Sequence, residues 1–502
     1  MFNGFVVLLF MFSFAASVQS AVITVNSSSP SQVWEGWGAS DLSSFDALAS
    51  EVEAGAPGPI PVLGRKAILK LYYRDLGMNF VRFAPWGYEP DNDNDDPFTI
   101  NPSGFVWEGR GNRPVSALNN VCRDHLVLGK EFRVRTEPFI FYPALNQWER
   151  WFAVAPEGRW MLGPDGKFKS AMVDEYAEHA LAAIMHVEQR FGYNMPYWSL
   201  FNEPSNTATP SKETTLALVR ACGRRFKQHS IQTKLVICDD VTPEASAATI
   251  EYVLADKEAR NYIGAVSYHR YCGDFVLEKV KQMLRKADKG ELLVEGPVSF
   301  YDSAHKYGKS VWVSEQCSYG DQGITLYDAG RARANHICDE INNAGVNAFN
   351  FMLCWFVERG KPGNEECPIY IHFKDGRYSG CEVNAFGASI RHFTRHIRPG
   401  MSRLPIASDD NRIKAVAFQN RTKKDGNLVI VTVNNFATPT ELSIRIKGTS
   451  GSGKVTVLRT EPGRTDQDKP ALALTDGILL DTVPGYSVTT YNVKADSTAA
   501  NR

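Results

Sequence analysis

Two short acidic motifs carry the clearest chemistry in this chain. Residues 198–204 read WSLFNEP and place Glu203 behind an apolar run, and residues 311–315 read VWVSE and end on Glu315. Both runs are short and apolar, which is typical of a buried β-strand. If the two strands belong to one parallel barrel, their C-terminal ends converge on one face and bring the two carboxyl groups together. Such a pair can cleave a glycosidic bond, because one carboxyl protonates the leaving oxygen while the other attacks the anomeric carbon or activates a water.

The pattern around these motifs indicates the elements that must position them. Between residues 34 and 391, short apolar runs alternate with longer amphipathic stretches, as in repeated βα units. The expected strands are 36–39, 80–83, 132–136, 197–201, 235–238, 265–268, 310–314 and 348–354, and the clearest helices are 64–76, 172–191, 213–229 and 327–344. Eight such units close a (β/α)8 barrel, so we predict an α/β fold with a TIM barrel over residues 34–391.

After residue 391 the sequence pattern changes. Between 392 and 495, strand-like runs at 413–418, 427–433, 440–446, 455–459 and 486–493 are separated by turn residues. This pattern predicts an antiparallel β-sandwich side domain. Residues 21–33 begin with a strand-like alternation, and we expect them to complete the sandwich from the other end of the chain. No Pro- or Ser-rich linker separates the units, so rigid packing is expected, and the polar tail 496–502 is expected to be disordered.

Chain length and net charge restrict the kinds of protein that this sequence can encode. The 502 residues exceed one small domain and fit a barrel of about 250 residues or more plus a second unit. The hydrophobic content of 43% and aromatic content of 11% can build a large core. The formal net charge is −1, with no long basic run, which argues against a nucleic-acid partner because phosphate binding needs concentrated positive charge.

The first twenty residues have the pattern of a secretory signal peptide. Residues 5–18 are mostly apolar, and small residues precede Ala21 at the expected cleavage site. The run is shorter than the ~20 residues that a membrane span needs, and no later segment is apolar enough to cross a bilayer. We therefore expect a secreted, extracellular protein with no membrane attachment after signal removal. Nine cysteines fit an oxidising compartment, with Cys367 and Cys381 as the expected disulfide.

Four segments resemble glycoside hydrolase family 30, most closely its endo-β-1,6-galactanase branch. Residues 34–40 (WEGWGAS) resemble the first-strand motif, 201–204 (FNEP) the acid/base motif, 312–315 (WVSE) the nucleophile motif, and 394–401 (TRHIRPGM) the segment that joins barrel and side domain. The resemblance implies a retaining β-glycosidase that works by double displacement. Glu203 would then be the general acid/base and Glu315 the nucleophile.

Further candidates surround the two glutamates. The resemblance implies that Arg82 supports the charge of Glu315, and that Asn202 donates to the sugar 2-hydroxyl. A peripheral salt bridge for Arg82 and a strand-end cap for Asn202 remain alternatives. His269 and Tyr271 follow the sixth expected strand and could orient either glutamate, although His269 could also be an ordinary core histidine.

Three tryptophans are candidate sugar platforms, because the CH faces of sugars pack on aromatic rings. Trp355 follows the eighth expected strand, and Trp37 and Trp86 are similar candidates. A buried core position is the alternative for each. We expect no metal and no cofactor, and a monomer that binds a polysaccharide or oligosaccharide.

The sequence leaves the substrate open. The best guess is an endo-β-1,6-galactanase, and β-1,6-glucanase, xylanase and β-glucosidase-type activities are alternatives. A non-catalytic carbohydrate-binding protein on a glycosidase scaffold is a hypothesis of another class. Loss of either glutamate would have favoured it, and both are present.

Overall fold

The computed structural model describes most of the chain from residue 19 to residue 495. The described ranges are 19–41, 60–83, 96–105, 107, 118–133, 139–141, 162–163, 165–206, 209–270, 279–294, 296–317, 323–357, 366–421, 426–448 and 452–495. The expected signal peptide and the polar tail therefore lie almost wholly outside the described residues. Within these ranges, no helix combines the length and the hydropathy needed to cross a membrane.

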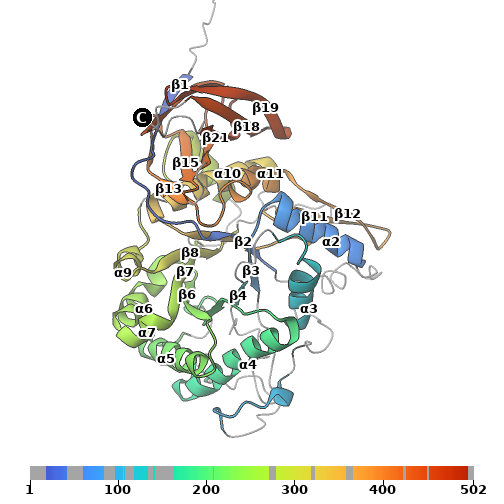
Figure 1. Ribbon diagram of the computed structural model, residues 1–502, viewed down its shortest axis with the longest axis vertical. Coiled ribbons are helices and arrows are strands. Elements are labelled where there is room, and N and C mark those ends of the chain that lie inside the picture. The colour runs from blue at the N-terminus through green and yellow to red at the C-terminus, as the bar shows by residue number, and fades with distance from the viewer. Residues whose placement is uncertain are drawn as a thin grey trace, which may run out of the picture.

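Eight parallel strands form a closed barrel. They are β2 (Gly36–Ser40), β3 (Phe80–Phe83), β4 (Phe139–Phe141), β5 (Tyr197–Ser199), β6 (Lys234–Asp240), β7 (Ile263–His269), β8 (Ser310–Glu315) and β9 (Ala348–Phe351), and β9 pairs with β2 to close the ring. The TIM-barrel-type domain expected from the alternating pattern is present. Figure 1 shows the helices that surround these strands.

The third barrel strand lies elsewhere than predicted. Residues 132–136 were expected to form it, but Phe132 ends a turn in which its N–H donates to Gly129, and the strand is Phe139–Phe141. A parallel barrel strand is covered on both faces and favours a continuous apolar run. The sequence FIF at 139–141 satisfies that requirement, whereas 132–136 carries two arginines.

The predicted segments 64–76, 172–191, 213–229 and 327–344 are helical within two residues at each end. These and further helices cover the barrel. They are α2 (Val62–Lys70) with η1 (Leu71–Asp75), α3 (Leu118–Cys122) with η3 (Arg123–Leu128), α4 (Val173–Phe191), α5 (Lys212–Gln228), α6 (Pro243–Ala255), α7 (Lys257–Tyr262), α8 (Lys279–Asp288), α9 (Tyr301–Lys306), α10 (Leu326–Asp339) with η5 (Glu340–Ala344), and α11 (Ala385–Thr394). Local chemistry sets several of their ends. Thr325 and Asp328 form a capping box at the start of α10, and Gly192 ends α4 in the left-handed conformation.

Apolar side chains fill the barrel below its C-terminal end. A separate cluster of buried residues comprises Phe80, Val236, Ala265, Trp312 and Ala348. The Trp312 ring lies 4.7 Å from the Tyr197 ring and 5.6 Å from the Phe80 ring, measured between centroids. Because Trp312 precedes Glu315 by three residues on β8, the polar groups described below collect above this packed layer.

The C-terminal unit is one continuous sheet rather than the two sheets of a sandwich. Its ten strands, in spatial order, are β13 (Ser402–Leu404), β15 (Ile413–Gln419), β16 (Leu428–Asn434), β21 (Val488–Ala495), β18 (Gly453–Glu461), β19 (Arg464–Thr475), β20 (Ile478–Val483), β17 (Thr440–Lys447), β1 (Gln19–Asn26) and β14 (Ile406–Ser408). Side chains from both ends of this order share one core, so the sheet folds over on itself. As expected, the N-terminal strand β1 takes part, and it pairs in parallel with β17.

The sheet and the barrel pack against each other through apolar and polar contacts. Val416, Phe418 and Val431 of the sheet belong to the same buried cluster as the barrel residues. The Phe418 ring lies 5.7 Å from the ring of Trp34, just before β2. Figure 1 shows α10 and α11 between the two units. This shared core holds the units as one body.

The predicted disulfide between Cys367 and Cys381 is absent. Both residues are free thiols, as are all the other cysteines in the described ranges. Cys381 lies opposite Ile371 in the hairpin of β11 (Ile369–Lys374) and β12 (Arg377–Val383), whereas Cys367 precedes β11 and has no place opposite it. The hairpin pairs further with β10 (Phe356–Val357) and lies beside α2 (Figure 1).

Candidate active site

Glu203 and Glu315 converge at the C-terminal end of the barrel. Glu315 is the last residue of β8, and Glu203 follows β5 in a turn where its N–H donates to the carbonyl of Asp239 at 2.9 Å. One oxygen of each carboxylate and one ring nitrogen of His269 all lie within 4.8 Å of one another. The Glu203 side chain keeps 19% of its surface exposed and the Glu315 side chain 10%, so a substrate can reach both.

Arg82 lies beside Glu315. Its side chain is fully buried, and one guanidinium nitrogen donates to the Glu315 carboxylate. The other donates to Asn202 Oδ1 at 2.5 Å and to Asp239 Oδ2 at 3.0 Å. The guanidinium is planar, so these bonds fix the orientation of Glu315 and Asn202 together.

His269, the last residue of β7, bridges the two glutamates. Its Nδ1 lies 3.0 Å from Glu203 Oε1 and 3.9 Å from Glu315 Oε1. On its other side, Nε2 lies 3.5 Å from Asp239 Oδ1 and 3.1 Å from the Arg82 guanidinium. Burial by itself would lower the pKa of His269, but the negative charge of Glu315 and hydrogen bonds to Asp239 and Glu203 raise it to about 9. The negative charges of Glu315 and Asp239 outweigh the positive charge of the one guanidinium and favour the charged imidazolium.

Asp239 was not predicted from the sequence, but it belongs to the same network. It contacts Arg82 and the side of His269 that faces away from the two glutamates. The residue is 1% exposed and lies near the end of β6. Its carboxylate accepts hydrogen bonds from Ser267 Oγ at 2.9 Å and from Ser314 Oγ, besides the Arg82 contact. Burial would raise its pKa, but the charge of Arg82 and the bonds from His269 and Ser314 hold it well below the ordinary range. The signal for it was available, because two aspartates follow the apolar strand 235–238.

Two of the three predicted tryptophan platforms lie in the core. Trp37 is 0% exposed and donates its ring N–H to the carbonyl of Ile397 at 2.8 Å. Residues alternate across a strand, and because Ser40 of β2 meets Arg82 inside the barrel, Trp37 faces the helices outside it.

Trp355 is 3% exposed, and its ring stacks on His125 at 5.5 Å between centroids. A second ring, that of Tyr72, meets it edge-on at 5.8 Å. These contacts are packing beneath the helical layer and leave no open face for a sugar. Trp86 and Tyr271, the remaining predicted site residues, lie outside the described residues.

The cluster of Glu203, His269 and Glu315 is the one group of potential metal ligands among the described residues. A metal would need a neutral imidazole nitrogen with a lone pair. The Arg82 guanidinium, which donates to Glu315 and lies 3.1 Å from His269 Nε2, already supplies a positive charge here, so the group fits an ion-paired acid–base site better than a metal centre.

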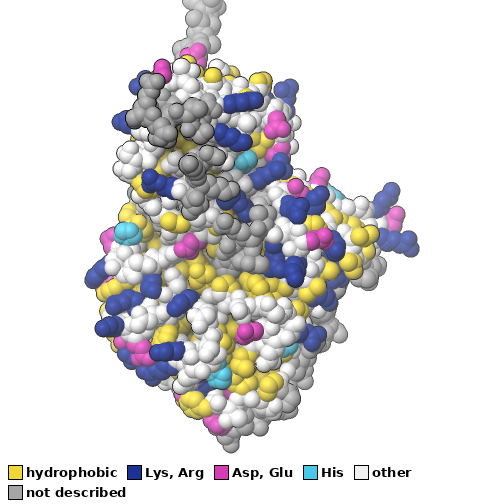
Figure 2. Space-filling model, in the orientation of Figure 1, with side chains coloured by type: hydrophobic (Ala, Val, Ile, Leu, Met, Phe, Trp, Pro, Cys, Tyr) yellow, Lys and Arg dark blue, Asp and Glu magenta, His cyan; other side chains and the backbone are white. Residues whose placement is uncertain are grey.

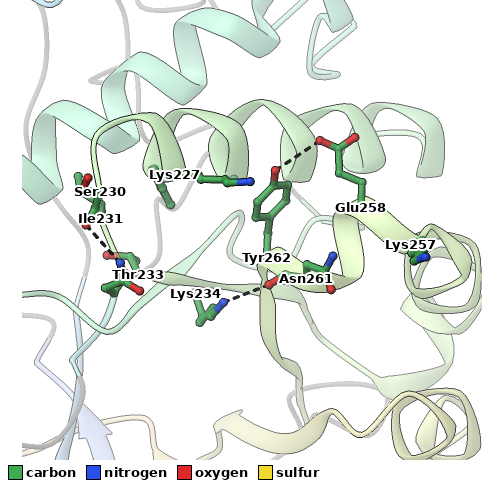
Figure 3. Close-up of a pocket in the computed structure, with 12 residues that line it drawn as sticks. Lys227, Ser230, Ile231, Thr233, Lys234, Lys257, Glu258, Asn261 and Tyr262 are labelled. Carbon is green, nitrogen blue, oxygen red and sulfur yellow. Dashed lines mark hydrogen bonds between the residues drawn. The ribbon is translucent and has the colours of Figure 1, made fainter.

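A wide cavity opens at the opposite end of the barrel. It has a volume of about 800 Å³ and lies between α5 and α7, next to the start of β6 (Figure 3). Several of its polar groups bond to each other: Lys234 Nζ donates to the Asn261 carbonyl at 3.1 Å, and the Tyr262 hydroxyl donates to Glu258 at 3.4 Å. In a TIM barrel the N-terminal face serves stability, so the candidate site is the cluster at the C-terminal face.

Comparison with solved structures supports this reading of the fold. The catalytic domain of a GH30 xylanase from Talaromyces cellulolyticus superposes with a TM-score of 0.66 and 16% identity, over 94% of this chain and 100% of that one. A GH30 endoxylanase from Clostridium papyrosolvens gives a TM-score of 0.63 at 16% identity, over 94% and 100%. An endo-β-1,6-glucanase gives 0.61 at 16% identity, over 95% and 94%. This chain has a GH30-like fold.

The agreement extends over both units of the GH30-like fold, since each match covers more than nine-tenths of this chain. At 16% identity it establishes the architecture, and the chemistry rests on the site itself. No model of a protein family matches the sequence. No curated protein matches it either.

Proposed function

We propose that this protein is a retaining β-glycoside hydrolase in which Glu203 is the general acid/base and Glu315 the nucleophile. One observation carries the proposal: oxygens of the two carboxylates lie within 4.8 Å of each other at the C-terminal face. Retaining enzymes hold their carboxyl groups about 5–5.5 Å apart, whereas inverting enzymes need about 6.5–9.5 Å to admit a water between them. The close approach supports double displacement.

The first chemical step uses both glutamates. A Glu315 oxygen attacks the anomeric carbon and forms an ester with the sugar, while the proton of Glu203 passes to the leaving oxygen as the glycosidic bond breaks. The guanidinium of Arg82 and the imidazolium of His269 stabilise the Glu315 carboxylate before attack. In the second step Glu203 removes a proton from a water that attacks the anomeric carbon, and the ester to Glu315 breaks.

Asn202 is suited to hold the sugar. Its Oδ1 accepts the bond from Arg82, so the side chain is turned with its amide NH2 away from the guanidinium. A hydrogen bond from this NH2 to the 2-hydroxyl would strengthen as charge develops on the ring. This role for Asn202 follows the family resemblance.

For the substrate we propose a β-linked polysaccharide, with β-1,6-galactan first and β-1,6-glucan, xylan and β-glucosides as alternatives. Two of the similar structures are named xylanases and one an endo-β-1,6-glucanase, so the same architecture serves different glycans. We further propose that the protein is secreted after loss of residues 1–20 and acts as a monomer.

A screen of the purified protein against defined β-1,6-galactan, β-1,6-glucan and xylan tests the proposal. Product lengths distinguish internal cleavage from release of end units, and proton NMR of the first product shows whether the anomeric configuration is retained. Release of the inverted anomer would contradict the double displacement. Binding of a glycan without any cleavage would instead favour a carbohydrate-binding protein on this scaffold.

A further inference from the structure

Asp239 occupies an irregular place in the barrel wall. The pairing of β6 with β7 skips from Cys238 to Asp240, so Asp239 is an extra residue in its strand. The pairing of β7 with β8 skips Ser314 in the same way, and Ser314 donates its hydroxyl to Asp239. Bulges of this kind re-aim side chains beside active sites. Here two bulges on strands on either side of β7 turn their side chains toward each other.

The backbone at this place is also unusual. Cys238 has φ +80° and Asp239 φ +53°, and Glu203 has φ +48°. Residues other than glycine rarely adopt these values, and they do so where the surrounding structure compels them. The carbonyl of Asp239 accepts the N–H of Glu203 at 2.9 Å, so the two irregular segments are joined directly. The path of the β6 backbone therefore sets the position of the acid/base candidate.

The Asp239 carboxylate accepts hydrogen bonds from side chains on four other barrel strands. Besides Arg82 of β3, serine hydroxyls reach it from β5, β7 and β8, at 3.5 Å for Ser199 and 2.9 Å for Ser267. Since the residue is 1% exposed, these protein groups take the place of water around the charge. Such a carboxylate is held in one orientation and keeps its negative charge.

The negative charge of Asp239 favours the protonated form of His269. The ionisable groups that face the imidazole are Arg82 from β3, Glu203 after β5, Asp239 from β6 and Glu315 from β8. On the outer side of β7, Arg270 pairs with Glu340 at 2.7 Å and so does not face the ring. Without Asp239, Arg82 and His269 would share only the two glutamates that the reaction itself protonates or esterifies.

We propose that Asp239 is a positioning residue of this site, whose carboxylate orients Arg82 and holds His269 as a cation against Glu203 and Glu315. The proposal deepens the glycosidase function and rests on it for its kinetic consequence. Asp239 is 1% exposed and therefore out of a substrate's reach, so it acts through the two cations. Because it carries no proton in either step, its charge stays constant while those of the two glutamates change.

The test replaces Asp239 with Asn, which keeps the size and removes the charge. Two-dimensional NMR of histidine-labelled full-length protein follows the titration of His269, and we expect its pKa to fall by at least about one pH unit. On a hydrolysed substrate, kcat should fall about 10²–10³-fold with a smaller change in KM. The alkaline limb of the kcat profile should move to lower pH.

Asp339→Asn is the matched control. Asp339 is another buried aspartate in an ion pair, 2.5 Å from Lys414 Nζ, away from the site. Its variant should lose stability while the titration of His269 and the pH profile stay unchanged. An unchanged His269 titration in Asp239→Asn would overturn the proposal. The NMR result does not depend on turnover, so inactivity of the wild-type protein on every glycan would contradict the glycosidase function alone.

A second pair of variants covers the case in which Asp239→Asn does not fold. Ser267→Ala and Ser314→Ala each remove one donor from Asp239 but keep its charge. We expect kcat to fall about tenfold in each while His269 still titrates at high pH, because orientation is loosened and charge is retained. Wild-type kcat in both serine variants would contradict the positioning role.

Discussion

The carboxylates of Glu203 and Glu315 come from strands that are three apart in the barrel, yet a single imidazole contacts both. His269 Nδ1 lies 3.0 Å from the first and 3.9 Å from the second. Arg82 holds Glu315 from the other side, so the two glutamates sit in different surroundings. Glu203 is the more exposed of the two, as suits a group that exchanges protons with water, and Glu315 is enclosed by cations.

Glu203→Gln and Glu315→Gln should both abolish turnover of natural glycans, but only the first should respond to azide. On an activated aryl glycoside the acid is not needed, and azide can replace the water that Glu203 would have activated, giving a β-glycosyl azide. The product's anomeric configuration is read by NMR. Rescue of only the Glu315 variant, with an α-azide product, would exchange the two assigned roles. Glu258→Gln, at the opposite end of the barrel, serves as a control that keeps activity.

Arg82→Lys should reduce kcat by about 10²–10³-fold although it preserves the positive charge. A lysine cannot donate at once to Glu315, Asn202 and Asp239 in the fixed geometry of the guanidinium. Steady-state kinetics measures the loss. Arg331→Lys is the matched control, because Arg331 is also buried but pairs with Asp288 and Asn435 at the boundary with the sheet. A drop of similar size in the control would show that the effect is general destabilisation.

The stability of the protein should fall as the pH rises from about 6.5 to about 9. His269 has a pKa raised from 6.5 to about 9 in the folded state, so folding favours its protonated form. Its contribution, about 3 kcal/mol, is complete below the lower value and is lost as the pH passes through the upper one. Urea unfolding at pH 6 and pH 10 measures it. His269→Gln should lack this part of the pH dependence, and an equal pH dependence in both proteins would refute the charged state of His269.

The barrel should not fold without the sheet. Truncation after Thr394, the end of α11, removes Val416 and Phe418 from the shared buried cluster, and we expect insoluble or unstable protein. In the full chain, Phe418→Ala should lower the free energy of unfolding by about 3–5 kcal/mol. Leu480→Ala on β20 is the control: this side chain is 67% exposed and should change stability by less than about 0.5 kcal/mol. A soluble truncated barrel with activity on short oligosaccharides would show that the sheet is a separate binding module.

The charge on the visible face agrees with a neutral substrate. Figure 2 shows Lys and Arg side chains scattered over both units, interspersed with acidic and hydrophobic ones. Activity on a neutral glycan should therefore depend little on salt, because the described residues on this face form no dense positive patch that salt would screen. Assays at low and high ionic strength measure this, and a steep loss of activity with salt would indicate an acidic substrate instead.

The sequence by itself predicted the barrel, four of its helical segments and the convergence of Glu203 and Glu315 at one end of it. These features depend on local patterns: apolar runs that repeat at βα spacing, and side chains placed at the end of such a run. Glu203, Glu315, Arg82 and His269 share one face because every parallel strand ends there, so their order along the chain is enough to bring them together.

Only the tertiary structure decided the rest, because it depends on which distant segments pair. Two aspartates follow the apolar strand in the sequence, but the bulge that turns Asp239 into the site cannot be predicted from a local pattern. The single sheet likewise depends on β17 pairing with β1 and β20 rather than with β18. Trp37 and Trp355 were misread for a related reason. Whether an aromatic ring lines a cleft or fills a core depends on what packs over it, and both rings are covered by helical segments distant in sequence.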